Sequence, residues 1–541
     1  FTIEFWIKDG SGYFLSGSPI LHKSRVSNNS AGEGGGIYIF DETMSNGNSD
    51  EIPVISNSII SENISTSNGG GICMYQSNAE INNTVIKENQ SSNGGGIRID
   101  GFYTHPMIMN CSIINNNAQE GGGLKLTFAT RPDITNSIVS NNTANEGGGI
   151  WMQQSEPNLI NSNFTNNTAT TVGGGLYVFV YSIPTFNTVN LHYNSASMGG
   201  AIYVSNNSNP LIESICASGN TSQVGGAIYI ESGNPIVTNS NLLNNGFSVF
   251  NYDNAFITQA TNNYWGSAVG PYHASQNPNG QGDSTNQWVN VTPWLTAPNI
   301  DAPPIPAQNI SVTGTGNDFI NLEWDQSPLG DFAGFKLYYD IDESGYPYEN
   351  SIDIGSNTSH SLSGLNLGTE YFLAITVYDT DGNESWYSKE TIGVTRVMEV
   401  QNLDIAGDEN LQHLVAHNPL IIFDYFDSMG ETQSNYQIQI SMDPTFQSFI
   451  FWDTGVVPSD ATTAQYDQGL LANGQSYYLR VKVASGDFWS EWSELSFRMN
   501  SAPSSPVQLS LIDNEVTTDD VLLEISNSSD AEGDNLSYDF R

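Results

Sequence analysis

Glycine-rich triplets recur at a nearly constant spacing through the first half of the chain. Each triplet reads Gly-Gly-Gly or Gly-Gly-Ala, and the later ones are spaced 26 residues apart. The triplets end at Gly36, Gly71, Gly96, Gly123, Gly149, Gly175, Ala201 and Ala227. A fixed period of this size predicts a solenoid, in which each repeat forms one coil and stacks only on its neighbours.

An alternating apolar trio follows each triplet, as in Ile37-Tyr38-Ile39 or Ile150-Trp151-Met152. Alternation of this kind predicts a strand whose outer two residues face the core and whose middle residue faces outward. A second short segment of Asn, Ser and aliphatic residues comes about a dozen residues later, for example at 134–142 and 237–245. Asn, Ser and Gly are poor residues for a helix interior, so each repeat is predicted to be one coil of a parallel β-helix.

The GGGI and GGAI motifs with their Asn-rich turns resemble the repeats of bacterial surface β-helix proteins, including chlamydial polymorphic outer-membrane proteins and other pectin-lyase-like domains. The segments 262–266 (NNYWG), 270–273 (GPYH) and 293–295 (PWL) are similar to the closing segment of many secreted bacterial β-helices. The resemblance implies a right-handed parallel β-helix over residues 1–300, with a cap over its apolar end. It also implies a secreted bacterial protein, of the kind that Bacteroidota-type bacteria export by a type IX-like route.

Residues 298–308 (PNIDAPPIPAQ) are rich in Pro and predict a linker. Residues 303–396 resemble a fibronectin type III domain, because Leu365 precedes Tyr371 with the six-residue offset of a tyrosine corner. Residues 397–500 repeat this offset between Leu471 and Tyr477.

The second module carries the sequence WSEWS at 489–493, which matches the WSxWS pattern of cytokine-receptor fibronectin modules. In those modules the Trp rings stack on Arg side chains, which makes Arg480 the expected partner. Residues 501–541 resemble the start of a further sandwich module, so the chain is expected to be a fragment of a longer protein. The predicted fold class is therefore all-β, a right-handed parallel β-helix solenoid followed by fibronectin type III-like β-sandwiches.

The middle residues of the trios form one predicted column on the outside of the solenoid. Its most distinctive members are two cations followed by four aromatic residues: Arg98, Lys125, Trp151, Tyr177, Tyr203 and Tyr229. An exposed aromatic stripe beside cations could bind a glycan by ring stacking or dock another protein. The alternative is structural, because aromatic residues favour strands, stabilise a sheet face by stacking, or lie under a neighbouring domain.

No segment matches a phosphate-binding loop, an HExxH zinc site, a CxxC pair or a GxSxG elbow. The best cluster for a polysaccharide lyase is Arg98 with Asp100 and Lys125, since such enzymes need a base beside carboxylates. Ordinary surface charge is the favoured interpretation of this cluster. No catalytic residue and no organic cofactor are therefore assigned, and an enzymatic activity is not the favoured prediction.

Acidic turns provide candidate calcium ligands, although none has the full spacing of an EF-hand loop. The candidate residues are Asp340, Asp342, Asp379, Asp381, Asp530 and Asp534. Structural calcium is a prediction at these turns, and a solvated turn is the alternative. The three cysteines, Cys73, Cys111 and Cys216, fall on different coils or sides, so no disulfide is predicted.

The chain has 57 acidic and 14 basic residues, which gives a formal net charge of −43. Such a charge opposes binding to nucleic acid, and no stretch is long and apolar enough for insertion into a membrane. We expect a secreted or cell-surface structural or adhesive protein with a β-helix rod and fibronectin spacers. Its expected partner is a polysaccharide, a surface protein or further copies of itself, and a lyase or hydrolase of the pectin-lyase-like fold is the alternative.

Overall fold

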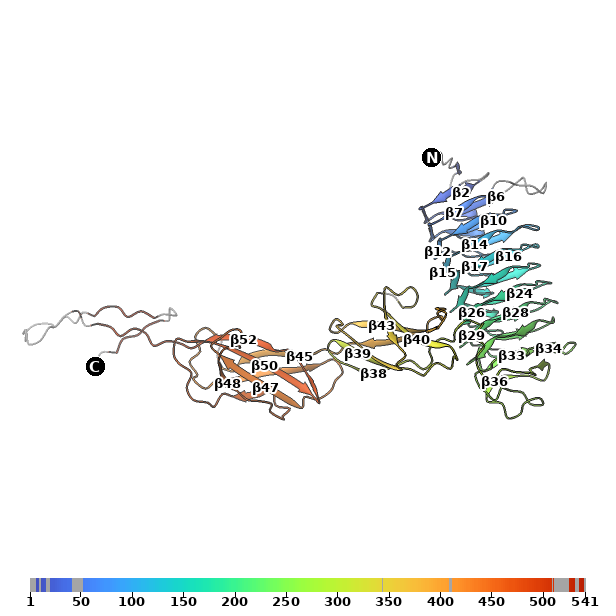
Figure 1. The fold of residues 1–541 in the computed structure, drawn as a ribbon. Helices are drawn as coiled ribbons and strands as arrows, with labels where there is room; N and C mark the ends of the chain where they lie inside the picture. The colour runs from blue at the N-terminus through green and yellow to red at the C-terminus, as the bar shows by residue number, and fades with distance from the viewer. Residues whose placement is uncertain are drawn as a thin grey trace, which may run out of the picture.

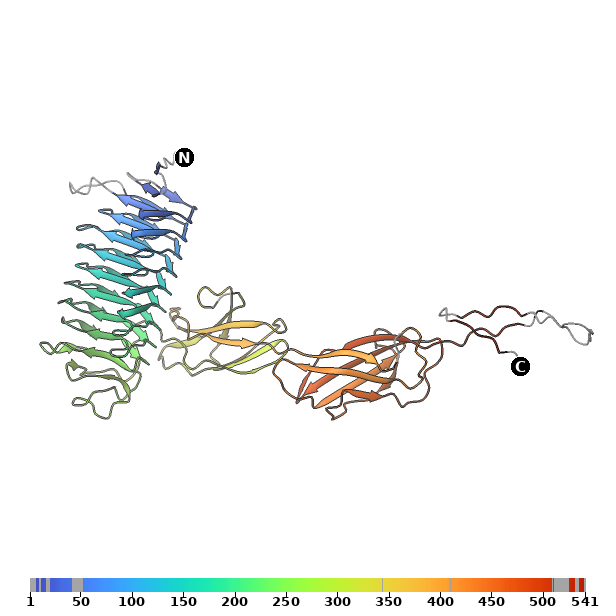
Figure 2. The same ribbon diagram turned by 180° about the vertical axis from the view of Figure 1, so that it is seen from behind.

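The computed structural model describes residues 6–8, 11–15, 20–40, 52–342, 344–407, 411–507, 509, 525–530 and 535–539 of the 541 residues. An upright solenoid forms the first part of the molecule, and two sandwich modules extend sideways from its lower half (Figure 1). The view from behind shows the first module against the flank of the solenoid and the second module beyond it (Figure 2). All named elements are strands, as the sequence predicts.

Sheet 1 of the solenoid contains the strands that follow the glycine triplets. Except for β1, which pairs antiparallel with β2, neighbouring strands pair in parallel, one strand per coil. In spatial order it contains β1 (Trp6–Lys8), β2 (Ser11–Leu15), β6 (Ile37–Phe40), β10 (Ile72–Tyr75), β13 (Ile97–Asp100), β16 (Leu124–Thr127), β20 (Ile150–Gln153), β24 (Leu176–Phe179), β27 (Ile202–Val204), β30 (Ile228–Ile230), β33 (Phe247–Asn251), β36 (Gly282–Thr285) and β35 (Pro271–Tyr272).

Two further parallel sheets complete each coil. Sheet 2 contains β3 (Ile20–His22), β7 (Val54–Ser56), β11 (Glu80–Asn82), β14 (Met107–Met109), β17 (Asp133–Thr135), β21 (Asn158–Ile160), β25 (Thr185–Asn187), β28 (Leu211–Glu213), β31 (Ile236–Thr238), β34 (Thr258–Gln259) and β37 (Val289–Asn290). Sheet 3 contains β4 (Arg25–Ser27), β8 (Ile59–Ser61), β12 (Val85–Lys87), β15 (Ser112–Ile114), β18 (Ile138–Ser140), β22 (Asn163–Thr165), β26 (Val189–His192), β29 (Ile215–Ser218) and β32 (Asn241–Leu243). Short parallel pairs, β5 (Ser30–Glu33) with β9 (Ile64–Asn68) and β19 (Thr143–Glu146) with β23 (Thr168–Val172), lie before the triplets.

The interior of the solenoid is a continuous column of aliphatic side chains with almost no exposure. Ile150 and Met152 face this core while Trp151 between them faces outward, which confirms the predicted alternation. One buried Asn per coil closes the turn after sheet 3. Its side-chain amide donates to the Asn Oδ1 of the next coil and to a backbone carbonyl, so the turns are stacked in register.

The predicted closing segment covers the last coil of the solenoid. Trp265 is fully buried in the solenoid core with Val289 and Val291, and Trp294 packs against the same core. Gly270 has a left-handed backbone, and an added Cβ there would lie 2.6 Å from the Trp294 ring. The apolar end is therefore sealed, which prevents edge pairing at this end.

The two modules after the solenoid are antiparallel sandwiches. The first has one sheet of β38 (Ser311–Thr315), β39 (Phe319–Glu323) and β42 (Ser359–Ser363), and another of β41 (Asn350–Gly355), β40 (Phe332–Asp340), β43 (Glu370–Asp379) and β44 (Thr391–Val394). The second has β45 (Met398–Ile405), β46 (Leu420–Asp427) and β49 (Thr463–Gln465) facing β48 (Ile450–Asp453), β47 (Asn435–Ser441), β50 (Ser476–Ser485), β51 (Phe488–Trp489) and β52 (Ser493–Arg498).

Both predicted tyrosine corners are present. The backbone N–H of Asn366 donates to the Tyr371 hydroxyl at 2.9 Å, and that of Ala472 donates to the Tyr477 hydroxyl at 3.0 Å. In the WSEWS segment the Arg480 guanidinium lies 4.3 Å from the centroid of Trp492, which confirms the predicted pairing. Lys482 extends the stack, with its ammonium 4.6 Å from the centroid of Trp489.

The Pro-rich segment between solenoid and modules is packed rather than extended in solvent, which corrects the prediction of a linker. Residues 302–307 are buried, and Ile305 belongs to the core of the first module together with Cys216 and Leu243 of the solenoid. The Asn299 backbone N–H donates to Asn241 Oδ1 at 2.8 Å, and the Asn241 side-chain amide donates to the Asn299 carbonyl at 3.0 Å. The segment is held because the outer face of sheet 3 offers apolar and amide side chains to it.

Within the described ranges, no helix is long and apolar enough to cross a membrane. Much of the predicted third module, residues 501–541, lies outside the described residues. That prediction therefore stays untested.

Candidate functional site on the outer face of sheet 1

The predicted outward column exists in register on sheet 1. Parallel pairing places Arg98 beside Lys125, Lys125 beside Trp151, and Trp151 beside Tyr177. The column continues through Tyr203 and Tyr229 to Phe250. The sequence therefore gave the correct neighbours across the coils.

The aromatic half of this column is not an exposed stripe, which corrects the sequence expectation. Trp151, Tyr177, Tyr203 and Tyr229 are only 4 to 8% exposed. They form a second hydrophobic cluster on the outer face of sheet 1, together with Val172, Met198, Val224, Phe179 and Phe250. The rings pack edge to face or stack on one another, for example Tyr203 on Tyr229 with centroids 5.1 Å apart. Residues flanking the strand thus cover ring faces that a glycan would need.

The two cations of the column, Arg98 and Lys125, each form an ion pair with a neighbouring carboxylate. Lys125 is buried, forms an ion pair with Glu120, donates to Asn93 Oδ1 at 2.7 Å and lies 4.3 Å from the Trp151 centroid. Burial lowers the pKa of Lys125, although the hydrogen bond from its ammonium to Glu120 opposes this shift. Arg98 donates to Asp100 at 2.7 Å. Neither cation is positioned as a free catalytic base.

An open cavity of about 600 Å³ lies on the same face, over the first coils. We call it the sheet 1 cavity, and its lining consists of Glu33, Tyr38, Phe40, Asn68, Cys73, Tyr75, Arg98 and Asp100. Tyr75 is 40% exposed, and its ring centroid lies 5.6 Å from that of Phe40. This cavity, rather than the aromatic column, presents accessible rings beside polar groups.

Arg98 and Asp100 of this lining were named from the sequence, but the two rings, Phe40 and Tyr75, and the polar residues Glu33 and Asn68 were not predicted. Phe40, Tyr75 and Asp100 occupy the next outward position, two residues further along each strand. Glu33 and Asn68 precede the triplets, and Asn68 donates to Glu33 at 2.6 Å. The same alternation, continued two residues beyond the middle residue of each trio, predicts that Phe40 and Tyr75 also face outward.

Protonation states in the cavity favour binding over nucleophilic chemistry. Burial, assisted by the Glu33 carboxylate, raises the pKa of the Cys73 thiol to about 12. Burial and the neighbouring Cys73 and Glu33 likewise raise the pKa of Tyr38 to about 12. At neutral pH both groups keep their protons, so Cys73 is not a thiolate nucleophile and Tyr38 is a hydrogen-bond donor.

Two of the candidate calcium residues, Asp340 and Asp379, cap turns. Asp340 accepts from the backbone N–H groups of Ile341 and Glu349, and Asp379 accepts from those of Asp381 and Asn383. In the described part of the chain, no three acidic, His or Cys side chains gather as metal ligands. Structural calcium at these turns stays a prediction. Asp530 is described without such a cluster, and Asp534 lies outside the described residues.

The three cysteines are buried and free, in agreement with the predicted lack of a disulfide. Cys111 lies directly before β15, and its thiol donates to the Met109 carbonyl. Cys216 lies under the first module. None of the three presents an accessible thiol.

Comparison with known families supports the architecture. Residues 14–183 match a family described as right handed beta helix region, and residues 303–393 match the fibronectin type III domain. Residues 400–500 match the Rha78A-like, N-terminal immunoglobulin domain. The chain is thus a right-handed β-helix followed by sandwich modules of fibronectin type III and immunoglobulin kind.

Among curated proteins, mouse neogenin is 29% identical over 163 residues, which is 30% of this chain and 10% of neogenin. Rat neogenin is 28% identical over 163 residues, or 11% of its length. The chain therefore spans about a tenth of these relatives.

Two solved structures are similar in part. A segment of two fibronectin type III domains from chicken tenascin covers 36% of this chain and 99% of its own, at 17% identity and a TM-score of 0.18. The fibronectin type III domain of human fibronectin type III domain containing protein 3 matches over 17% of this chain and 87% of its own length. The identity is 21% and the TM-score is 0.16.

Proposed function

We propose that this chain is part of an extracellular or cell-surface adhesive protein, in which the solenoid binds a neutral glycan in the sheet 1 cavity. The single observation that carries the proposal is the accessible ring pair of Phe40 and Tyr75 beside the polar side chains of the cavity. Rings beside hydrogen-bonding groups suit a ligand that has both apolar faces and hydroxyls. The β-helix and the fibronectin modules fit an extracellular or adhesive role.

The charge of the cavity selects against polyuronates. Glu33 and Asp100 are carboxylates, whereas Arg98 is the only cation among the described residues of the lining and is paired with Asp100. A uronate would meet this negative potential without a free cation, while a neutral sugar would not. The same pairing disfavours the lyase alternative, which needs an unpaired base beside the substrate.

Binding can be tested by titration calorimetry with cellohexaose, laminarihexaose and xylohexaose, and with hexagalacturonate as the acidic comparison. We expect one neutral oligosaccharide to bind, and Tyr75→Ala to weaken it at least tenfold, or about 1.4 kcal/mol. Tyr181→Ala is the matched control, because Tyr181 is 62% exposed on a turn outside the cavity lining. Binding only to a surface protein, or self-assembly without glycan binding, contradicts the proposal.

A separate measurement addresses catalysis. Each oligosaccharide is incubated with the chain and assayed for unsaturated products and new reducing ends. We expect no turnover. Turnover that Arg98→Ala abolishes would establish the enzymatic alternative.

A further inference from the structure

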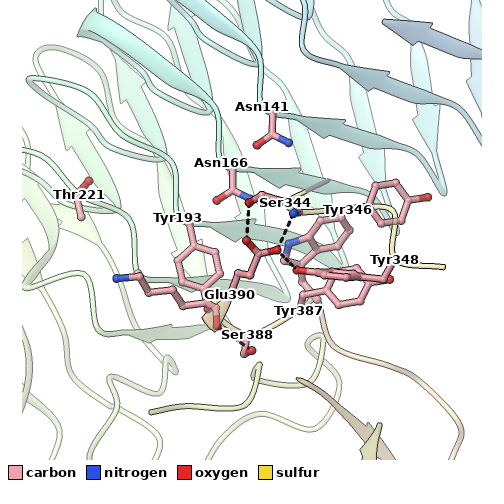
Figure 3. A pocket seen from close by; sticks show the side chains of 14 residues that line it. Asn141, Asn166, Tyr193, Thr221, Ser344, Tyr346, Tyr348, Tyr387, Ser388 and Glu390 are labelled. Atoms are coloured by element: carbon pink, nitrogen blue, oxygen red, sulfur yellow. Dashed lines mark hydrogen bonds between the residues drawn. The ribbon is translucent and has the colours of Figure 1, made fainter. Parts of the chain in front are cut away.

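A second cavity, of about 580 Å³, lies between the solenoid and the first sandwich module. Tyr346, Tyr348 and Tyr387 line it from the module, and Asn141, Asn166 and Tyr193 line it from three successive coils of the solenoid. Figure 3 shows Asn141 and Asn166 on the solenoid and, below them, Glu390 beside Tyr348 and Tyr387. We call it the junction cavity. It shares no lining residue with the sheet 1 cavity.

The solenoid wall is adapted locally to the module. Asn141, Asn166, Tyr193 and Gly219 occupy the same left-handed turn position in successive coils. Tyr193 replaces the usual Asn, and its hydroxyl is hydrogen-bonded to the backbone of Lys389. A Cβ on Gly219 would lie 2.7 Å from the Tyr193 ring, so glycine at that coil makes room for the ring. Tyr193 therefore binds the module beside the cavity, and Gly219 leaves space for the Tyr193 ring.

The module wall is held in place by one carboxylate. Glu390 accepts hydrogen bonds from the Ser344 hydroxyl, from the Gly345 N–H at 2.6 Å and from the Tyr348 hydroxyl at 2.7 Å. Behind it, Tyr348 packs on Tyr387 with centroids 5.1 Å apart, and Tyr346 packs on Trp386 at 5.6 Å. The rings are thus oriented before any ligand arrives, which reduces the ordering cost of binding.

Several polar groups of the lining are left without a partner. Among the described residues, the side-chain amides of Asn141 and Asn166 and the hydroxyls of Thr221, Tyr346 and Tyr387 make no hydrogen bond. By contrast, the neighbouring Asn142 and Asn167 use their amides fully within the stacked turns. The cavity therefore offers donors and acceptors on one wall and aromatic surface on the other.

We propose that the junction cavity binds a short neutral oligosaccharide, whose apolar face packs on the Tyr wall while its hydroxyls bond to the Asn141 and Asn166 amides. The charged side chains among the described residues of the lining are one carboxylate, Glu390, and one cation, Lys389, so the cavity has no net charge that would select an anionic sugar. The rings lie too close to one another to surround an ammonium group. The site goes beyond the proposed function, because it does not depend on the sheet 1 cavity.

The test uses the full chain and titrates cellotriose, maltotriose, mannotriose and triacetylchitotriose by calorimetry. Asn166→Asp and Tyr387→Phe are the decisive variants. The first replaces the amide donor by an acceptor-only carboxylate while keeping the backbone preference, and the second removes a hydroxyl while keeping the ring. We expect one trisaccharide to bind and each variant to weaken it at least fivefold. Asn207→Asp, at an exposed left-handed turn residue outside the cavity lining, is the matched control and should leave binding unchanged.

The proposal is overturned if none of the four trisaccharides binds, or if binding survives both variants. Preference for a Pro-rich peptide over every sugar, lost in Tyr387→Phe, also overturns it. Failure of this site is distinguishable from failure of the proposed function, because Tyr75→Ala affects only the sheet 1 cavity. A trisaccharide whose affinity falls in Tyr75→Ala and not in Asn166→Asp would locate it in the sheet 1 cavity and reject the junction site.

Discussion

At the residue scale, the positions of a glycine triplet differ in what a side chain would meet. Gly173 has a left-handed backbone, with φ of +65°. A Cβ on Gly174 would lie 2.4 Å from backbone oxygens of both Gly200 and Ser195. At the third position the chain itself carries alanine in two coils, at Ala201 and Ala227. A Cβ on Gly175 would also lie close to backbone, 2.6 Å from the Ala201 oxygen, but it meets one backbone oxygen rather than two. The third position is therefore less restricted than the first two, and the coils with Ala201 and Ala227 accommodate a methyl there.

Gly174→Ala should destabilise the solenoid by more than about 2 kcal/mol, because the added methyl meets backbone that cannot move without separating two coils. Gly175→Ala should cost clearly less, since the chain tolerates alanine at that position. The midpoint of thermal unfolding of each variant, followed by circular dichroism, measures the difference. Equal losses in the two variants would contradict the argument.

At the element scale, the Asn stack connects the coils independently of the strands. Five hydrogen bonds connect Asn142 to its neighbours in the Asn stack and to the Ile113 carbonyl. It donates to Asn167 from its backbone N–H and its side-chain amide, donates to the Ile113 carbonyl, and accepts twice from Asn116. The last member, Asn245, donates to Asp283, an acceptor-only carboxylate that ends the series. Burial raises the pKa of Asp283, although hydrogen bonds from Ser248 and Asn245 oppose this effect.

Asn142→Ala should cost about 3 kcal/mol, because it leaves the Ile113 carbonyl and the Asn116 donors buried without partners. The urea midpoint of the solenoid transition, followed by circular dichroism, tests this expectation. Asn145→Ala serves as the control, because Asn145 is exposed and its side chain has no hydrogen bond among the described residues. That variant should stay within about 0.5 kcal/mol of the parent.

At the scale of the whole molecule, the two sandwich modules are connected by an ion pair buried at their junction. Arg396 contacts Asp427 through two hydrogen bonds, and the two side chains are 7% and 1% exposed. Asn317 of the first module also donates to the Trp489 carbonyl of the second at 3.2 Å. The modules shown beside one another in Figures 1 and 2 are thus joined by specific contacts rather than by a flexible linker.

Acid should weaken this junction. Burial alone would raise the pKa of Asp427, but hydrogen bonds from Arg396, the Met429 N–H and Tyr425 hold it below its usual value. A carboxylate with a lowered pKa stabilises the folded state above its unfolded pKa of about 4, and this contribution is lost as pH falls through the folded pKa. Small-angle scattering and the unfolding midpoint of the second module, recorded from pH 7 to pH 2, should show the junction weakening below about pH 4.

Asp427→Ala should lower the stability of the second module by about 3 kcal/mol at pH 7, because Arg396 is left buried and unpaired. The same variant should lose the acid-dependent part of the scattering change. Asp467→Asn, at an exposed position, should behave like the parent. An unchanged acid response in Asp427→Ala would show that other carboxylates control the junction.

The sequence by itself determined the length of each coil, the position of its sheet 1 strand and which side chains of that strand face the core. These features depend on residues that are close together in the chain. The triplet period placed the sheet 1 strands from β6 to β30. The alternation separated Ile150 and Met152 from Trp151, and the six-residue offset located Tyr371 and Tyr477. Only the tertiary structure decided which outward residues are exposed. Trp151 and Tyr75 occupy outward positions of the same sheet, yet flanking side chains from neighbouring coils cover the first and leave the second open. The packing of residues 302–307 and the junction cavity likewise depend on surfaces brought together from distant parts of the chain, which no local pattern encodes.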